Sequence, residues 1–243
     1  MKVYAHRGYS GRYPENTMLA FRKAHETGCY GIELDVQMTK DGQVVIIHDE
    51  KIDRTTDGSG WVRDFTLEEL KQFNAAAAWN GAFGFEPIPT LEEYCQWVKD
   101  TDLVTNIEIK SGVYYYEELE EKTLELVRKY GLEKKIVFSS FLHSSITLLR
   151  RLAPDIPCGA LVEYDNLGNP GYYCEKFDFQ YYHPGMKALT EDMVKSCKEH
   201  GIGLNVWTIN DMGGLEQLYE WGCEGVISNF PGVCKGWLDS KER

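Results

Sequence analysis

Acidic residues alternate with apolar residues in two short segments of the chain. In residues 31–36, Glu33 and Asp35 alternate with aliphatic residues, and in residues 106–110, Glu108 lies between two isoleucines. Side chains at positions i and i+2 of a β-strand point to the same face, so Glu33 and Asp35 would share a face opposite the apolar residues. Carboxylates on the inner face of a sheet need partners, because an isolated buried charge is costly.

Two kinds of partner would satisfy these carboxylates. Arg7 and Lys110 lie at the ends of the same predicted strands and could form a salt-bridge network with them. The alternative is a hard divalent cation, Mg²⁺ or Ca²⁺, which prefers oxygen ligands. The spacing of the residues leaves both interpretations open.

A hairpin signal brings a histidine toward the carboxylates. The dipeptide Asp41-Gly42 is typical of a two-residue type I′ turn. With these two residues as the loop, the pairing along the hairpin places Asp35 opposite His48. His6 ends the first predicted strand, so a second imidazole reaches the same end of the sheet. Two histidines that flank a site are suited to general acid and general base catalysis near neutral pH.

Two ring side chains near predicted strand ends are further candidates. His183 would lie on the functional rim of a barrel, where it is either a substrate contact or a structural residue. Trp207 is predicted to point inward, either as a core residue or as an apolar wall for a small organic group. His25 and His200 fall on predicted helices, and we expect them to lie outside the site.

A scaffold of alternating strands and helices must position these side chains. The predicted strands span residues 2–7, 31–38, 43–48, 103–110, 136–141, 157–163, 178–183, 203–209 and 225–229. The predicted helices span residues 15–27, 90–100, 117–130, 144–153, 190–200 and 212–221. With residues 43–48 as the return of a hairpin, eight strands remain, and eight strands enclosed by helices predict an α/β fold, the TIM (β/α)8 barrel. An open doubly wound sheet is the alternative, although no G-x-G-x-x-G motif follows the first strand.

We expect one barrel domain over residues 1–243, with an insertion at about residues 50–88 after the second strand. This glycine- and aromatic-rich stretch is too long for a plain connection. It is either a surface elaboration with a small core of its own or a cover over the substrate.

The composition narrows the class of protein. The 243 residues carry a formal net charge of −12, which argues against nucleic acid as a partner because phosphates require a basic surface. Seven cysteines without a C-x-x-C pair indicate reduced thiols. No apolar run approaches the ~20 residues of a membrane span, so we expect no integral membrane segment. With no signal peptide at its start, the chain is expected in the cytoplasm, and its oligomeric state stays open.

Several short segments follow one another in an order and spacing that, taken together, are specific. They are His6-Arg7-Gly8, Pro14-Glu15-Asn16-Thr17, residues 31–36, Thr39-Lys40-Asp41-Gly42, His48-Asp49, Asp53-Arg54-Thr55-Thr56, residues 88–93, residues 106–110, residues 138–141 and residues 206–210. In these segments the chain resembles the glycerophosphodiester phosphodiesterase family over nearly its whole length. The resemblance implies a TIM-type barrel with a small insertion after the second strand.

The resemblance also implies a site and a reaction. A divalent metal ion, Mg²⁺ or Ca²⁺, would be held by Glu33, Asp35 and Glu108. The implied acid–base pair is His6 and His48, and the implied phosphate ligands are Arg7 and Lys110. The implied reaction is hydrolysis of a small-molecule glycerophosphodiester, such as glycerophosphocholine or glycerophosphoethanolamine, to glycerol 3-phosphate and an alcohol.

Three other functions compete with this one. A related barrel phosphodiesterase could act on another phosphodiester or a lysophospholipid. A non-catalytic binding module could use the same scaffold, although no motif residue of the site is lost. A metal-free barrel isomerase would leave the three inward carboxylates unexplained.

Overall fold

The computed structural model describes residues 1–164 and 167–241, and in these residues nine strands form one sheet. The strands are β1 (Lys2–His6), β2 (Gly31–Met38), β3 (Val44–Ile46), β4 (Val104–Ile109), β5 (Ile136–Ser140), β6 (Cys158–Val162), β7 (Tyr181–Pro184), β8 (Gly203–Val206) and β9 (Gly225–Ser228). All neighbouring strands pair in parallel except β3, which pairs antiparallel with β2. Because β1 pairs with both β2 and β9, the eight parallel strands close into a barrel.

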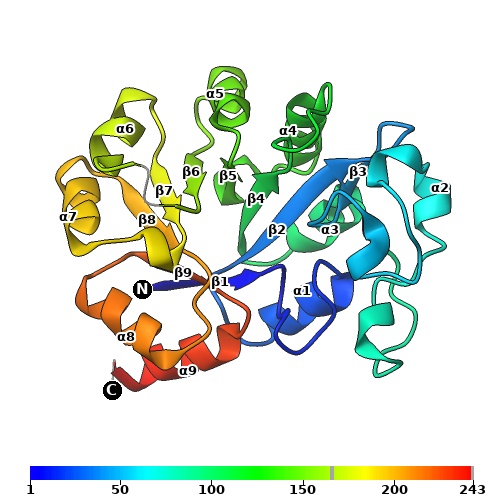
Figure 1. Cartoon of the computed structure of the whole chain (residues 1–243), viewed down its shortest axis with the longest axis horizontal. Coiled ribbons are helices and arrows are strands. Elements are labelled where there is room, and N and C mark those ends of the chain that lie inside the picture. The colour runs from blue at the N-terminus through cyan, green and yellow to red at the C-terminus, as the bar shows by residue number, and fades with distance from the viewer. Residues whose placement is uncertain (165–166, 242–243) are drawn as a thin grey trace.

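Helices connect the parallel strands and surround them (Figure 1). They are α1 (Met18–His25), α2 (Leu67–Leu70), α3 (Leu91–Val98), α4 (Leu119–Lys129), α5 (His143–Leu152), α6 (Pro170–Lys176), α7 (Glu191–Glu199), α8 (Met212–Glu220) and α9 (Pro231–Lys241). The predicted TIM (β/α)8 barrel is therefore confirmed, and the alternative open sheet is wrong.

The sequence pattern missed three helices: the one-turn helix α2 in the insertion, and the longer helices α6 and α9. Helix α6 begins at a proline that is followed by a glycine, and α9 contains two glycines after its first proline. Both residue types have low helix propensity in a helix interior, so the local pattern did not indicate a helix. Both helices nevertheless pack buried side chains against the barrel, among them Cys174 and Leu238.

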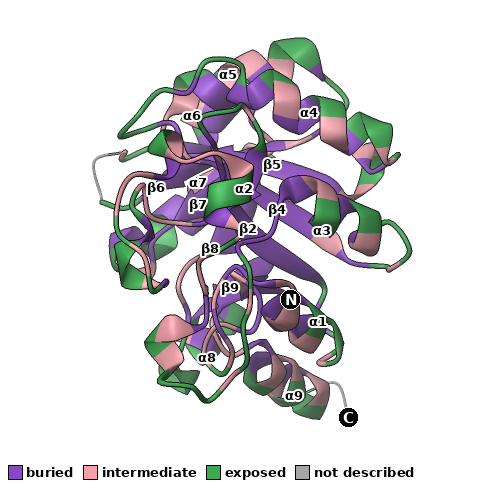
Figure 2. Ribbon diagram, turned by 90° about the vertical axis from the view of Figure 1, so that its right-hand side faces the viewer, coloured by how far each residue is buried: buried purple, intermediate pink, exposed green. Residues whose placement is uncertain are grey.

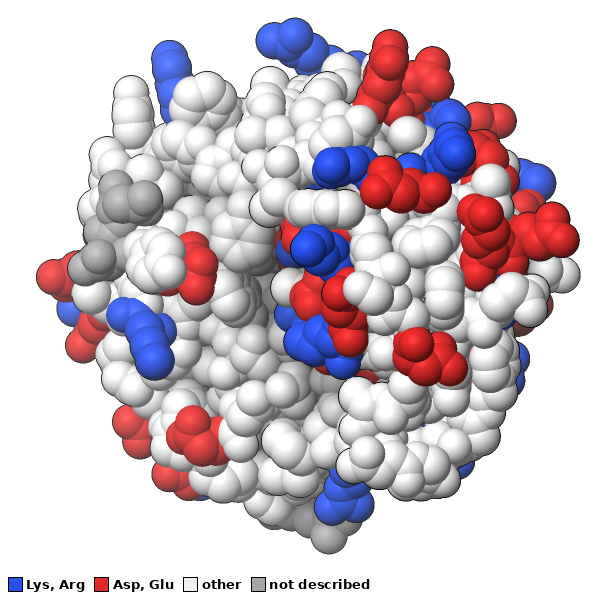
Figure 3. Space-filling view, turned by 45° about the vertical axis from the view of Figure 1, so that its right-hand side comes forward, with Lys and Arg blue, Asp and Glu red and all other residues white. Residues whose placement is uncertain are grey.

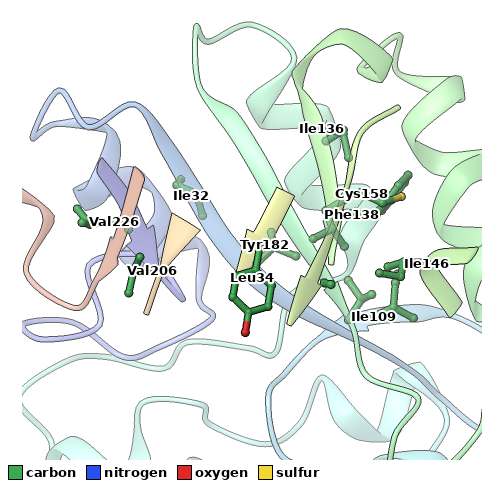
Figure 4. Packing of buried hydrophobic residues seen from close by; sticks show 14 of the residues in the cluster. Ile32, Leu34, Ile109, Ile136, Phe138, Ile146, Cys158, Tyr182, Val206 and Val226 are labelled. Atoms are coloured by element: carbon green, nitrogen blue, oxygen red, sulfur yellow. The ribbon is translucent and has the colours of Figure 1, made fainter. Parts of the chain in front are cut away.

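The main core lies between the barrel strands and the helices (Figure 2). Alternate strand residues such as Ile32, Leu34, Ile109 and Phe138 are fully buried in this layer, which Figure 4 shows from close by. Since successive side chains of a strand alternate in direction, the residues between these positions point into the barrel. This alternation turns Glu33, Asp35 and Glu108 inward.

The predicted register of the hairpin is wrong by one residue. Val36 pairs with Ile46, and the amide of Ile47 donates to the carbonyl of Asp35, so Asp35 lies opposite Ile47 and not His48. The loop has three residues, 40–42, and ends with Gly42 at φ +77°, a conformation that glycine adopts without strain.

The loop also makes a contact beyond the hairpin. Its Asp41 carboxylate accepts hydrogen bonds from the Thr39 hydroxyl and, at 3.0 Å, from the amide of Leu67 at the start of α2. This second bond joins the hairpin loop to the insertion.

The predicted insertion follows β3 and carries its own small apolar cluster. The segment contains three 3₁₀ turns, η1 (Ile52–Arg54), η2 (Val62–Asp64) and η3 (Ala77–Trp79), and the short helix α2 (Figure 1). The buried cluster consists of Val45, Ile47, Ile52, Val62, Leu70, Ala75 and Ile88. Because two of these residues belong to the β3 region, the cluster attaches the segment to the barrel.

The seven cysteines all lie in the described residues, where each is buried and unbridged. Among the described helices, none has both the length and the apolar character needed to cross a membrane.

Below the carboxyl-terminal rim, a polar pair fills the barrel interior. His183 of β7 and Asn205 of β8 are buried, and the Asn205 amide lies 2.9 Å from His183 Nε2. The neighbouring strands leave room for these side chains with glycines: a Cβ at Gly159 would lie 2.5 Å from His183 Nε2, and one at Gly225 would lie 2.0 Å from Asn205 Oδ1. In this part of the barrel interior, the large polar side chains of His183 and Asn205 occupy the space that Gly159 and Gly225 leave.

We predict that Gly159→Ala destabilises the protein. The added methyl group overlaps the buried imidazole, and overpacking of this kind costs ~1–3 kcal/mol. The matched control is Gly236→Ala on the exposed side of α9, where a Cβ meets no atom within 4 Å and helix propensity improves. Urea denaturation measures both free energies of unfolding. Equal stability of the two variants would contradict this packing.

We also predict a specific pH dependence of stability. Burial lowers the pKa of His183 to about 3, whereas the unfolded chain takes up this proton near pH ~6.5. As the pH falls below ~6.5, the unfolded state binds a proton that the folded state excludes, so folding is weakened down to about pH 3. The free energy of unfolding of His183→Gln should therefore fall less than that of the wild type when the pH is lowered from about 6 to about 4. The two slopes should differ by up to ~1.4 kcal/mol per pH unit.

Urea denaturation at several pH values checks this prediction. The control variant is His25→Gln on the exposed face of α1, which should follow the wild-type curve. A His183→Gln curve parallel to the wild type would show that His183 binds its proton equally in both states.

Candidate active site

A cavity of about 380 Å³ opens at the carboxyl ends of the barrel strands. Its walls are formed by His6, Arg7, Glu33, His48, Asn106, Glu108, Lys110, Phe141, Leu161, Glu163, Trp207 and Ile227. His6 is the last residue of β1, Lys110 follows β4, and Trp207 follows β8. This end of the barrel is where TIM-barrel enzymes carry their active sites.

Three carboxylates meet at the inner side of the cavity. Glu33, Asp35 and Glu108 each offer an oxygen, and these oxygens lie within 4.8 Å of one another. The residues are only 4%, 0% and 8% exposed. Strand pairing explains the convergence, because Asp35 of β2 is in register with Glu108 of β4.

The surroundings of the three carboxylates raise the pKa of the two glutamates and lower the pKa of the aspartate. Burial and the charges of Asp35 and Glu108 raise the pKa of Glu33 well above its ordinary value. Burial also raises the pKa of Glu108, with a further contribution from Asp35. Burial alone would raise the pKa of Asp35, but His48, Arg7 and Lys110 hold it below its ordinary value. Additional positive charge beside the cluster would oppose the increases in the pKa of the two glutamates.

Protein partners satisfy part of this cluster. Lys110 Nζ donates to Glu108 Oε1 at 2.9 Å, and the Arg7 amide donates to Glu33 Oε2 at 2.9 Å. Asn16 Nδ2 donates to Asp35 Oδ2 at 2.9 Å, while Asp35 Oδ1 makes no hydrogen bond among the described residues. The salt-bridge interpretation therefore accounts for some of the oxygens, but Asp35 Oδ1 has an ion-pair contact with Lys110 Nζ at 4.0 Å and no hydrogen bond among the described residues. A trio of oxygen donors with an unfilled position fits a hard divalent cation.

The two predicted histidines line the same cavity, each held by its Nδ1. His6 Nδ1 lies 2.6 Å from Asn229 Oδ1, which also accepts from the Ser10 hydroxyl. His48 Nδ1 lies 2.6 Å from Asp49 Oδ1. In each ring Nδ1 carries the hydrogen toward its acceptor, so Nε2 is left for the cavity.

The Nε2 atoms lie beside the charged groups of the site. His6 Nε2 is 3.9 Å from Glu33 Oε2, and His48 Nε2 is 3.3 Å from Lys110 Nζ. Burial and the nearby charge of Arg7 lower the pKa of His6 to about 4. His6 is therefore neutral at physiological pH. His48 does line the same cavity as Glu33 and Glu108, but it reaches the cavity from the segment after β3 and not through cross-strand pairing with Asp35.

A chain of ion pairs connects the two sides of the site. Asp49, which holds His48, accepts from Arg54 Nε at 2.6 Å. Arg54 also donates twice to Glu15 at 2.8 Å, and Glu15 accepts from Arg7 NH1 at 2.8 Å. Arg7 Nε in turn lies 3.5 Å from Asp35.

Sequence reasoning assigned no role to the residues that brace this site. Glu15, Asn16, Asp49 and Arg54 stood in the segments of the resemblance, which was the signal that could have found them. Asn229, which holds His6, is 223 positions away from it and had no such signal.

His183 does not lie where the sequence placed it. We expected it on the rim, as a substrate contact or a structural residue, but the side chain is 0% exposed and is not among the residues that line the cavity. Its carbonyl oxygen accepts a hydrogen bond from Trp207 Nε1 at 2.9 Å, which helps to fix the orientation of the indole. Trp207 itself lines the cavity as predicted.

The other histidines lie outside the cavity. His25 is exposed on α1, and His200 follows α7 and bonds to Glu175. His143 begins α5, where Nδ1 lies 2.6 Å from the Tyr173 hydroxyl.

The cavity has two unlike sides. Most of the charged residues belong to the carboxylate trio and its basic neighbours Arg7 and Lys110, whereas Phe141, Leu161, Trp207 and Ile227 form an apolar part of the wall that also includes Glu163. Figure 3 shows Lys, Arg, Asp and Glu side chains gathered along one side of a hollow, with uncharged residues across from them.

Comparisons with known proteins identify the family. The model of the glycerophosphoryl diester phosphodiesterase family matches residues 6–233. A glycerophosphodiester phosphodiesterase of Caldanaerobacter subterraneus subsp. tengcongensis is 41% identical over 229 residues, which cover 94% of each chain.

Solved structures agree. The structure of an Oleispira antarctica phosphodiesterase in complex with the product sn-glycerol-3-phosphate is 31% identical, with a TM-score of 0.88 over 98% of this chain and 97% of that one. A glycerophosphodiester phosphodiesterase from Thermotoga maritima is 31% identical, with a TM-score of 0.77 over 99% and 97% of the two chains. Given this match over the barrel and its cavity, the chain belongs to the glycerophosphoryl diester phosphodiesterase family of enzymes.

Proposed function

We propose that this enzyme hydrolyses glycerophosphodiesters to glycerol 3-phosphate and an alcohol, with a divalent metal ion and two histidines. The observation that carries the proposal is the cavity itself. It brings three buried carboxylates, two imidazole Nε2 atoms and two cationic side chains to one place. The Oleispira antarctica relative, crystallised with sn-glycerol-3-phosphate, supports the proposed product.

Glu33, Asp35 and Glu108 would hold the metal ion, Mg²⁺ or Ca²⁺. The buried Asp35 Oδ1, which makes no hydrogen bond among the described residues, and the all-oxygen donor set support this assignment. When bound, such an ion supplies Lewis-acid stabilisation to a phosphoryl oxygen and a template for substrate hydroxyls.

Arg7 and Lys110 would bind the phosphodiester. Burial lowers the pKa of Lys110, but Glu108 and Asp35 outweigh it and raise that pKa to about 12, so the ammonium is charged at neutral pH. Arg7 is fixed by Glu15 and Asp35, which keeps its guanidinium at the cavity wall. Preorganised cations of this kind stabilise negative charge that develops on a phosphoryl group.

His6 and His48 would transfer the protons. Each ring presents Nε2 to the cavity while its Nδ1 is held by Asn229 or Asp49. One imidazole can take a proton from the attacking hydroxyl, and the other can give one to the departing alcohol. The two fixed rings thus need no rearrangement before the reaction.

A reducing compartment such as the cytoplasm is part of the proposal. The seven buried, unbridged cysteines support it, because disulfides persist mainly in oxidising compartments.

We predict that the protein releases glycerol 3-phosphate from glycerophosphocholine and that dialysis against EDTA abolishes this activity. Mg²⁺ or Ca²⁺ should restore it. Glu33→Gln should weaken both turnover and metal binding, whereas Glu216→Gln on the exposed side of α8 is the matched control and should behave as wild type. A coupled assay for glycerol 3-phosphate measures turnover, and the dependence of turnover on the Mg²⁺ or Ca²⁺ concentration reports metal binding. Full activity after exhaustive chelation would overturn the metal assignment.

We predict that His6→Ala and His48→Ala each reduce kcat by ~10²–10⁴-fold, the usual contribution of a general acid or base. Far-ultraviolet circular dichroism should show that both variants fold. His25→Ala, on the exposed face of α1, should retain wild-type kcat. If His25→Ala lost as much activity as His48→Ala, the assignment of the pair would be wrong.

A further inference from the structure

The uncharged side of the cavity has a defined geometry. The Trp207 and Phe141 rings meet edge to face, with centroids 5.7 Å apart and an interplanar angle of 89°. The Trp207 indole is held from below, because its Nε1 donates to the His183 carbonyl at 2.9 Å. The wall is therefore a fixed aromatic surface and not a loose apolar patch.

A carboxylate borders this aromatic surface. Glu163 follows β6, lines the cavity, and forms no ion pair with the described residues. Gly185 keeps the two groups close: a Cβ at this position would lie 3.4 Å from the Glu163 carbonyl oxygen and 3.6 Å from Trp207 Cζ2. The Glu163 backbone and the indole are thus neighbours on the rim of one cavity.

Phe141 marks the boundary between the two sides. Lys110 Nζ lies 6.0 Å from the centroid of its ring, and Trp207 lies against the same ring. A phosphodiester bound by Arg7 and Lys110 would therefore have one of its two ester groups directed toward Trp207 and Glu163. The other ester group would face the carboxylate trio and its metal ion.

An aromatic surface and a carboxylate in the wall of one cavity together recognise a particular chemistry. The face of an indole attracts a cation through its quadrupole, and quaternary ammonium groups are bound in this way. A nearby carboxylate adds a direct Coulomb attraction. A neutral, hydroxyl-rich group would gain neither interaction.

We infer that Phe141, Trp207 and Glu163 form a subsite for an alkylammonium group on the alcohol that leaves. This inference rests on the proposed function and extends it, since it names the class of ester that the enzyme prefers. A cationic headgroup, as in choline or ethanolamine esters, binds the subsite while its phosphate is held by Arg7 and Lys110. Glu163 and Trp207 are then specificity-determining residues.

The test compares kcat/KM for glycerophosphocholine and glycerophosphoethanolamine with kcat/KM for glycerophosphoglycerol, whose second alcohol is uncharged. The wild type should favour both cationic esters. Glu163→Gln and Trp207→Leu should each reduce the ratio of cationic to neutral kcat/KM by about 2- to 30-fold, the range expected for a cation–π or exposed charge contact. Glu216→Gln on α8 is the control for the loss of one negative charge far from the cavity, and should keep the wild-type ratio.

The outcomes separate the two proposals. If no glycerophosphodiester is hydrolysed, the proposed function fails. If all three are hydrolysed and neither variant changes the ratio, only the alkylammonium subsite is overturned. An equal loss of kcat/KM for all three esters in Trp207→Leu also overturns the subsite. That result would place the indole against the glycerophosphate part that the three esters share. Because Glu163 is exposed, Glu163→Gln should fold. This variant therefore decides the result even if Trp207→Leu does not fold.

Discussion

The structure depends on three carboxylates that are forced into one buried space. Repulsion and loss of solvent both oppose their ionisation, as the raised pKa values of Glu33 and Glu108 show. Lys110 and Arg7 offset part of this cost, and a divalent cation would offset the rest. The barrel tolerates the cluster because its closed ladder of strands fixes the three side chains in register. A flexible scaffold would let the carboxylates separate into water.

The same constraint accounts for the arrangement around the trio. His48 belongs to the segment after β3, outside the barrel ladder, so it must be positioned by contacts with the rest of the site. The ion pairs of Asp49, Arg54 and Glu15 provide these contacts and join that segment to Arg7. His6 is fixed on the other side by Asn229, which lies just beyond β9, the strand that pairs with β1. Charged contacts hold one histidine, and closure of the barrel holds the other.

Local patterning explains which features the sequence predicted. Alternation along residues 31–36 and 106–110 gave the inward face of two strands, and the strand–helix rhythm gave the barrel. Features set by distant contacts did not follow from such patterns. The hairpin loop bonds through Asp41 to Leu67 outside the hairpin, and His6 is held by Asn229 at the far end of the chain.

Burial was equally hard to predict. The sequence placed His183 near a strand end, which is consistent with either the rim or the interior. The interior position is explained by Gly159 on the neighbouring strand, which leaves the space that the imidazole fills. The inward-facing carboxylates, in contrast, followed from alternation alone.

The most direct test of this account is the stability of the folded protein with and without the ion. Urea denaturation of the EDTA-treated protein, with Mg²⁺ or Ca²⁺ added in steps, gives the free energy of unfolding at each concentration. An ion that binds only the folded trio should raise that free energy by ~2.7 kcal/mol at 100 times its Kd, and the increase should vanish in the Glu33→Gln, Glu108→Gln double variant. In EDTA the double variant should be at least as stable as the wild type, because two crowded carboxylates are gone. A free energy of unfolding that does not respond to either ion would contradict the central claim that the buried carboxylates form a cation site.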